Sequence, residues 1–147
     1  MSQESVELVR GYLGALGTLT PEDISQHVPR FWEADGDLYP VGKFPEARSC
    51  HGVEEIARFL TEYRDAWDRY EMEVKKLIPV GDDRVLVHLA LRAEGRESGV
   101  RLEGDLYQCV WLRLGHFLRW EDHLTLKGAL RALGLSGETL EAAGLSE

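Results

Sequence analysis

Residues 71–126 read EMEVKKLIPVGDDRVLVHLALRAEGRESGVRLEGDLYQCVWLRLGHFLRWEDHLTL, and short turn signals divide them into four strand-like runs. The runs are residues 71–80, 84–94, 100–114 and 116–126. Connections this short join antiparallel neighbours, because a parallel return needs a crossover of about a dozen residues. Strands of about ten residues or more curve as they twist. We therefore predict a curved sheet whose concave face encloses a pocket.

Helical patterns precede these strands. Apolar residues recur every three or four positions between residues 6 and 16 and between residues 53 and 67, as on one face of a helix. A short helix between them starts at Thr20-Pro21 and ends by Pro29. Residues 31–40 read as a broken aromatic strand, and residues 127–133 and 137–143 as short helices. This order predicts an α+β cone: a strongly curved antiparallel or mixed sheet with three helices of the N-terminal half packed in its concave face.

Length and charge restrict the class of protein. A chain of 147 residues fits one domain, which we expect to span residues 1–147. The formal net charge of −9 argues against nucleic acid and anionic membrane surfaces as partners. The N-terminal residues show no basic segment before an apolar core, and no long apolar run occurs, so we predict a cytoplasmic protein.

The sequence offers little for a metal or a cofactor. Its histidines are scattered, with Glu121 and His123 as the single same-face pair of ligand types. Cys50 and Cys109 lie far apart in unrelated elements and are expected to be free thiols. The chain has neither a glycine-rich phosphate loop after a strand nor a Gly-x-Ser-x-Gly motif. We therefore predict no metal site and no cofactor.

Asp122 is the first candidate for chemistry. By strand alternation it shares a face with Leu118, Trp120 and Leu124. If that face is the inner one, Asp122 is buried, and a buried acid must be hydrogen-bonded or raised in pKa. The simpler alternative is a carboxylate turned outward. We predict Asp122 as a general acid or base.

Arg92, Glu94 and His88 are further catalytic candidates, because alternation places all three on one face of the run 84–94. An ion pair at the end of a strand is the simpler explanation for Arg92 and Glu94. The simpler explanation for His88 is a histidine of the core or of an interface, and proton transfer is the alternative.

Aromatic side chains are expected to shape a ligand pocket for a small, mostly apolar molecule. Six of them are candidates for ligand binding, although a plain core would also use them. They are Tyr12, Tyr39, Tyr63, Trp67, Tyr107 and Trp120.

Four segments carry a resemblance to a known family: GVEEIARF at 52–59, RAEGRESGV at 92–100, VWLRLGH at 110–116 and ALRALGL at 129–135. With these the chain resembles the nuclear-transport-factor-2-like (NTF2-like) superfamily, and within it the SnoaL-like, polyketide cyclase-like proteins. The resemblance covers nearly the whole length. It implies a pocket and often a dimer, but no particular reaction.

Local motifs add to this resemblance. Arg92-Ala93-Glu94 and Trp120-Glu121-Asp122 are similar to the Arg-x-Asp and Trp-x-Asp pairs of limonene-epoxide hydrolase, with Glu94 in place of the first Asp. That similarity implies one carboxylate that activates water and a second acid that protonates the leaving oxygen. SnoaL-like cyclases use a single Asp, for which Asp122 is the match. The stretch that would hold the base of ketosteroid isomerases carries Tyr39 instead, while Tyr12 matches their tyrosine.

We therefore predict a cofactor-free acid/base enzyme of the isomerase, cyclase or epoxide hydrolase type. Asp122 would act as acid or base, with Arg92 and Glu94 orienting or ionising it. The alternative is a non-catalytic ligand-binding or interaction module of the same fold. Residues 85–91 are apolar at almost every position, so we also expect the outer sheet face to be covered, by a second copy in a homodimer.

Overall fold

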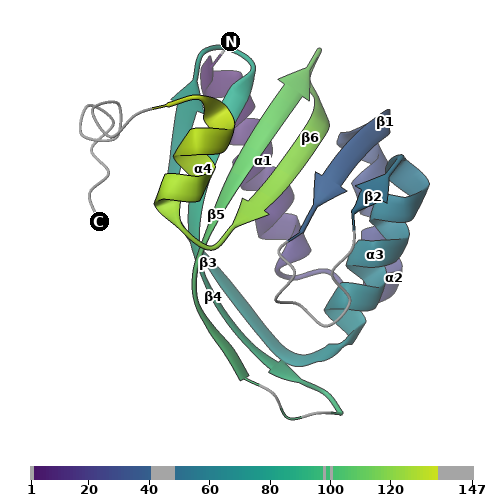
Figure 1. The fold of residues 1–147 in the computed structure, drawn as a ribbon. Helices are drawn as coiled ribbons and strands as arrows, with labels where there is room; N and C mark the ends of the chain where they lie inside the picture. The colour runs from purple at the N-terminus through teal and green to yellow at the C-terminus, as the bar shows by residue number, and fades with distance from the viewer. Residues whose placement is uncertain (1, 41–48, 98, 100, 136–147) are drawn as a thin grey trace.

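The computed structural model describes residues 2–40, 49–97, 99 and 101–135, and the helix predicted at 137–143 lies outside this part of the chain. Figure 1 shows the arrangement of its helices and strands. In chain order these are α1 (Ser2–Leu16), α2 (Pro21–His27), the 3-10 helix η1 (Val28–Arg30), β1 (Trp32–Tyr39), β2 (Cys50–His51), α3 (Val53–Asp65), β3 (Trp67–Val80), β4 (Arg84–Gly95), β5 (Arg101–Arg113), β6 (His116–His123) and α4 (Leu126–Leu133).

The strands form one mixed sheet in the order β2-β1-β6-β5-β4-β3. Strands β3 to β6 are an antiparallel meander, as their short turns predict. Two further strands, β1 and β2, complete the sheet on the β6 side: β1 runs parallel to β6, and β2 pairs antiparallel with β1 at the edge. The predicted α+β cone with its curved sheet is confirmed.

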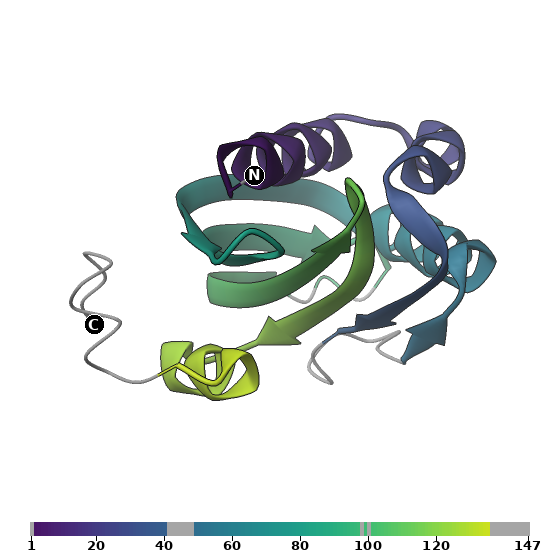
Figure 2. The same ribbon diagram turned by 90° about the horizontal axis from the view of Figure 1, so that it is seen from above.

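The main core lies between the inner face of the sheet and the helices of the N-terminal half. Val85, Val87 and Leu89 of β4 alternate towards this side and are almost completely buried. From the helices, α1 contributes Val9 and α3 contributes Ile56 to the same core. Figure 2 shows α1 lying across the curved sheet, with α2 and α3 beside it. None of the helices in the described ranges is long and apolar enough to span a membrane.

A second, smaller core lies on the outer face, where α4 packs against β5 and β6 and Leu86 of β4 joins the same cluster. The Thr125 hydroxyl caps this helix by accepting from the amide of Gly128, and Gly134 ends it at a positive φ of 72°. Leu86 and Cys109 are buried beneath it. The apolar outer surface that suggested a second copy is therefore covered, at Leu86, by the chain's own C-terminal helix.

A β-bulge in β6 changes which residues face inward. Phe117 pairs with Leu112 and Arg119 with Trp111, so Leu118 has no partner in the ladder. The extra residue places both Phe117 and Trp120 in the inner core, although they are three positions apart. The expected inner face of Leu118, Trp120, Asp122 and Leu124 is thus corrected: Leu118 is half-buried and Leu124 is 49% exposed.

Candidate active site

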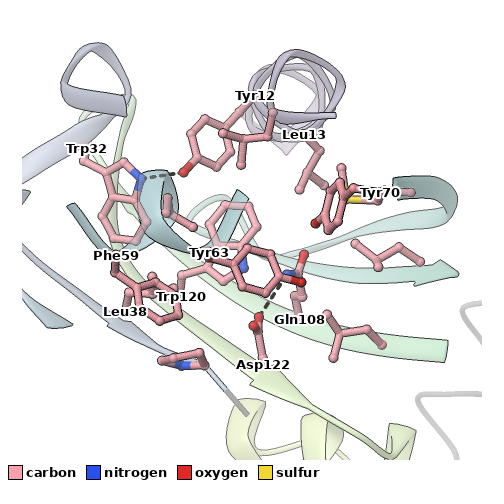
Figure 3. A pocket seen from close by; sticks show the side chains of 16 residues that line it. Tyr12, Leu13, Trp32, Leu38, Phe59, Tyr63, Tyr70, Gln108, Trp120 and Asp122 are labelled. Atoms are coloured by element: carbon pink, nitrogen blue, oxygen red, sulfur yellow. Dashed lines mark hydrogen bonds between the residues drawn. The ribbon is translucent and has the colours of Figure 1, made fainter. Parts of the chain in front are cut away.

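The inner face of the sheet encloses a pocket together with α1 and α3 (Figure 3). Its cavity volume is about 70 Å³, and one side is open to solvent. Most of the wall is apolar, from residues such as Leu13, Leu38, Phe59, Met72, Leu89 and Leu106. Polar atoms come from a smaller set: Tyr12, Trp32, Tyr63, Tyr70, Gln108, Trp120 and Asp122. Such a pocket suits a small, mostly apolar molecule with one or two polar groups.

Asp122 is the one acidic residue among the described residues of this wall, and no Lys, Arg or His is found among them. Its neighbour across the β5–β6 ladder is Gln108, whose Nε2 donates to Asp122 Oδ1 over 2.9 Å. Burial raises the pKa of Asp122 to about 7, against the opposing effect of hydrogen bonds from Gln108 and Trp120. A carboxyl group with this pKa can take up or release a proton near neutral pH.

The tyrosines of the pocket are held in their protonated form. The hydroxyl of Tyr12 accepts a hydrogen bond from Trp32 Nε1 at 2.9 Å. Burial raises the pKa of Tyr12 and Tyr63, and that of Tyr70 to about 12. The rings of Tyr63 and Tyr70 meet edge to face, with their centroids 5.7 Å apart. At neutral pH these phenols are hydrogen-bond donors, not bases.

The structure does not bring Arg92, Glu94 or His88 to Asp122. On β4 the odd-numbered residues point into the core, so these three lie on the outer face. Arg92 is 63% exposed and pairs with Glu103 at 3.1 Å. The expected group of Arg92 and Glu94 around Asp122 is thus corrected, because the sheet itself separates them.

His88 also faces outward. Its Nε2 lies 3.0 Å from Asp105 Oδ1, and its ring stacks on Tyr107 with centroids 4.6 Å apart. Tyr107 is therefore an outer-face residue and does not line the pocket.

Of the six aromatic candidates, Tyr12, Tyr63 and Trp120 line the pocket. Tyr39 lies on the opposite face of β1, where the Arg119 guanidinium sits 4.5 Å from the centre of its ring. Trp67 is a buried core residue at the start of β3, in edge contact with Tyr63. These positions follow from strand phase: Leu38 points into the pocket, so its neighbour Tyr39 points away.

Trp32, Tyr70 and Gln108 belong to the site but were not among the sequence candidates. For Gln108 a signal was present. It alternates with Leu106 and Val110, which makes it a polar residue on an apolar face. A buried amide of this kind needs hydrogen-bond partners, and carboxylates are among the strongest.

Within the described ranges, no group of three or more His, Cys, Asp or Glu side chains lies close enough together to hold a metal ion. The one same-face pair, Glu121 and His123, lies on the outer face. His123 Nε2 is 3.1 Å from Glu121 Oε1, and Arg119 pairs with the other oxygen of the same carboxylate. These contacts form a row of polar side chains along the outer face of β6.

No family model matches the sequence, and no curated protein matches it. Solved structures do share the fold. An NTF2-like protein from Burkholderia xenovorans LB400 is 17% identical, with a TM-score of 0.69, and the match covers 90% of this chain and 97% of that one. An epoxide hydrolase similar to limonene-epoxide hydrolase, from M. tuberculosis, is 19% identical, with a TM-score of 0.66 and coverage of 90% and 94%.

A third structure, assigned as a SnoaL-like polyketide cyclase, comes from Jannaschia sp. CCS1. It is 14% identical, with a TM-score of 0.66, and the match covers 92% of this chain and 94% of that one. The resemblance to the NTF2-like and SnoaL-like proteins is confirmed as a likeness of fold. At these identities it does not specify an activity.

Proposed function

We propose that this chain, which has the NTF2-like fold, is a cofactor-free enzyme that moves a proton on a small, mostly apolar molecule, with Asp122 as the acid or base. The observation that carries the proposal is the Asp122 carboxyl group in an apolar pocket, with its pKa raised to about 7. Perturbed groups of this kind concentrate at functional sites, because proton transfer is most efficient when the pKa lies near the working pH.

The number of acids in the pocket wall supports one reaction type over the other. Hydrolysis of an epoxide by the scheme above uses two acids, one for water and one for the leaving oxygen. The described pocket wall has one, since Glu94 lies on the other face of the sheet. A single carboxylate suits a reaction in which the same group removes a proton and returns it elsewhere, as in an isomerase or a cyclase.

We expect the wild type to accelerate exchange of the α-hydrogens of 2-tetralone in D₂O at pH 7, measured by proton NMR. This probe is an apolar bicyclic ketone with acidic C–H groups next to its carbonyl. Asp122→Asn should reduce the enzymatic rate by about 100- to 10,000-fold, the usual contribution of general acid/base catalysis. The matched control is Asp105→Asn, an identical change on the outer face, which should leave the rate unchanged.

Exchange at the wild-type rate in Asp122→Asn would contradict the proposal.

A second candidate function is a non-catalytic binding module, which the mostly apolar wall with its single charged group also supports. In that case the wild type would bind 2-tetralone without accelerating exchange, and Asp122→Asn would alter affinity alone.

A further inference from the structure

One polar atom in the pocket wall has an unmet hydrogen-bonding need. Gln108 is 8% exposed, and its Nε2 donates to Asp122. Its Oε1 is buried and has no hydrogen-bond partner within the described residues. An unpaired buried carbonyl destabilises the folded state, so most proteins avoid one unless something else supplies the donor.

The orientation of this amide follows from its neighbour. Above its pKa of about 7 Asp122 is ionised and only accepts hydrogen bonds, so at pH 8 it fixes the NH₂ group of Gln108 towards itself. The carbonyl oxygen must then point the other way. Figure 3 shows the amide beside Asp122, in a pocket wall that also includes Tyr63 and Tyr70. Gln108 is part of the pocket wall, but its Oε1 is covered, so a bound molecule supplies the donor when the side chain turns its carbonyl towards the pocket.

We propose that Gln108 selects ligands that carry an N–H or O–H donor, which its Oε1 accepts, beside the group on which Asp122 acts. The ligand class is then a small apolar ring or chain with a hydroxyl, enol or N–H group. The link to Asp122 chemistry rests on the proposed function, whereas the binding preference stands without it. A site built around a buried hydrogen bond rejects a ligand that lacks the donor, because the acceptor would stay unpaired.

Indole and benzofuran test this preference, because they have nearly the same shape and differ in an N–H group replaced by oxygen. We expect the wild type to bind indole about three- to tenfold more tightly than benzofuran in isothermal titration calorimetry at pH 8. In Gln108→Met, which keeps the length of the side chain but not its carbonyl, the preference should disappear. Gln26→Met, the same change at an exposed position of α2, should retain it.

Equal affinities of the wild type for the two probes, or no binding of either, would overturn the inference. So would a preference that persists in a folded Gln108→Met variant, with folding checked by circular dichroism. Should that variant not fold, Gln108→Asn replaces it; the shorter side chain withdraws the carbonyl and should weaken the preference. The calorimetry needs no turnover, so an inactive enzyme that still prefers indole would disprove the proposed function and leave this inference intact.

Discussion

The two faces of the sheet use the same residue types for different purposes. On the outer face, carboxylates such as Asp105 and Glu103 pair with His88 and Arg92 and are more than half exposed. On the inner face, Asp122 has an amide and an indole as hydrogen-bonding neighbours and no cation among the described pocket residues. The same kind of carboxyl group therefore forms a solvent-exposed pair on one side, while burial in the apolar wall on the other side raises the pKa of Asp122 to about 7.

This contrast shows that the environment, and not the residue type, makes a candidate for catalysis. Exposed ion pairs contribute about 0–1 kcal/mol and are screened by salt. A carboxylate in an apolar wall destabilises the folded protein when it is ionised, and such a cost is typical of functional sites. Predictions that set one face against the other therefore test the assignment directly.

The largest difference in stability is expected at the bulge of β6, between Phe117 and Leu118. Phe117 is fully buried and packs against the rings of Tyr12, Trp32 and Trp120, whereas Leu118 is half-buried. Phe117→Ala should lower the free energy of unfolding by about 3–5 kcal/mol, and Leu118→Ala by about 1 kcal/mol. Urea denaturation measures both. Equal losses would mean that the bulge does not set the phase of β6.

The next effect concerns stability and pH at Asp122. The folded protein keeps the proton of Asp122 up to its raised pKa of about 7, whereas the unfolded chain releases it near the ordinary value of 3.8. Between these values the folded state binds more protons, so this group makes stability fall as the pH rises from about 4 to about 7. Asp122→Asn carries no charge and should be more stable than the wild type at pH 8, by about 2–4 kcal/mol.

The same two proteins should differ little at pH 4, where Asp122 is protonated in both its folded and much of its unfolded state. Urea denaturation at the two pH values measures the difference, with Asp105→Asn as the control from the outer face. A gain of the same size at pH 4 and pH 8 would show that Asp122 does not titrate with a raised pKa.

Much of the fold could be predicted from the sequence, because turn residues and alternation are local signals. Val85, Val87 and Leu89 needed no tertiary information to be placed on one face of β4. The pocket needed more, since a bulge shifts the phase of a strand without a clear mark in the sequence. At Leu118 that shift was missed, whereas Trp120 and Asp122, which follow the bulge, do line the pocket.

The partners of Asp122 show the second limit. Arg92 and Glu94 lie on one face of β4, but the sequence does not say whether that face is on the same side of the sheet as Asp122. Register decides this: Gln108 pairs with both Val87 and Asp122, and so the inward residues of three strands meet. The sequence also did not show that the chain's own helix α4 covers part of the outer face of the sheet, at Leu86. The homodimer accordingly stays a prediction that rests on the resemblance.

The smallest effect is expected on the outer face at Arg92. Its side chain is 63% exposed and pairs with that of Glu103, which is 68% exposed, so the pair lies in solvent. Arg92→Ala should leave the free energy of unfolding nearly unchanged, and added salt should reduce any remaining difference. The rate of 2-tetralone exchange should stay at the wild-type value, because the sheet lies between Arg92 and the pocket. A loss of exchange activity in a variant of normal stability would show that Arg92 acts in the pocket, and this would contradict the separation of the two faces.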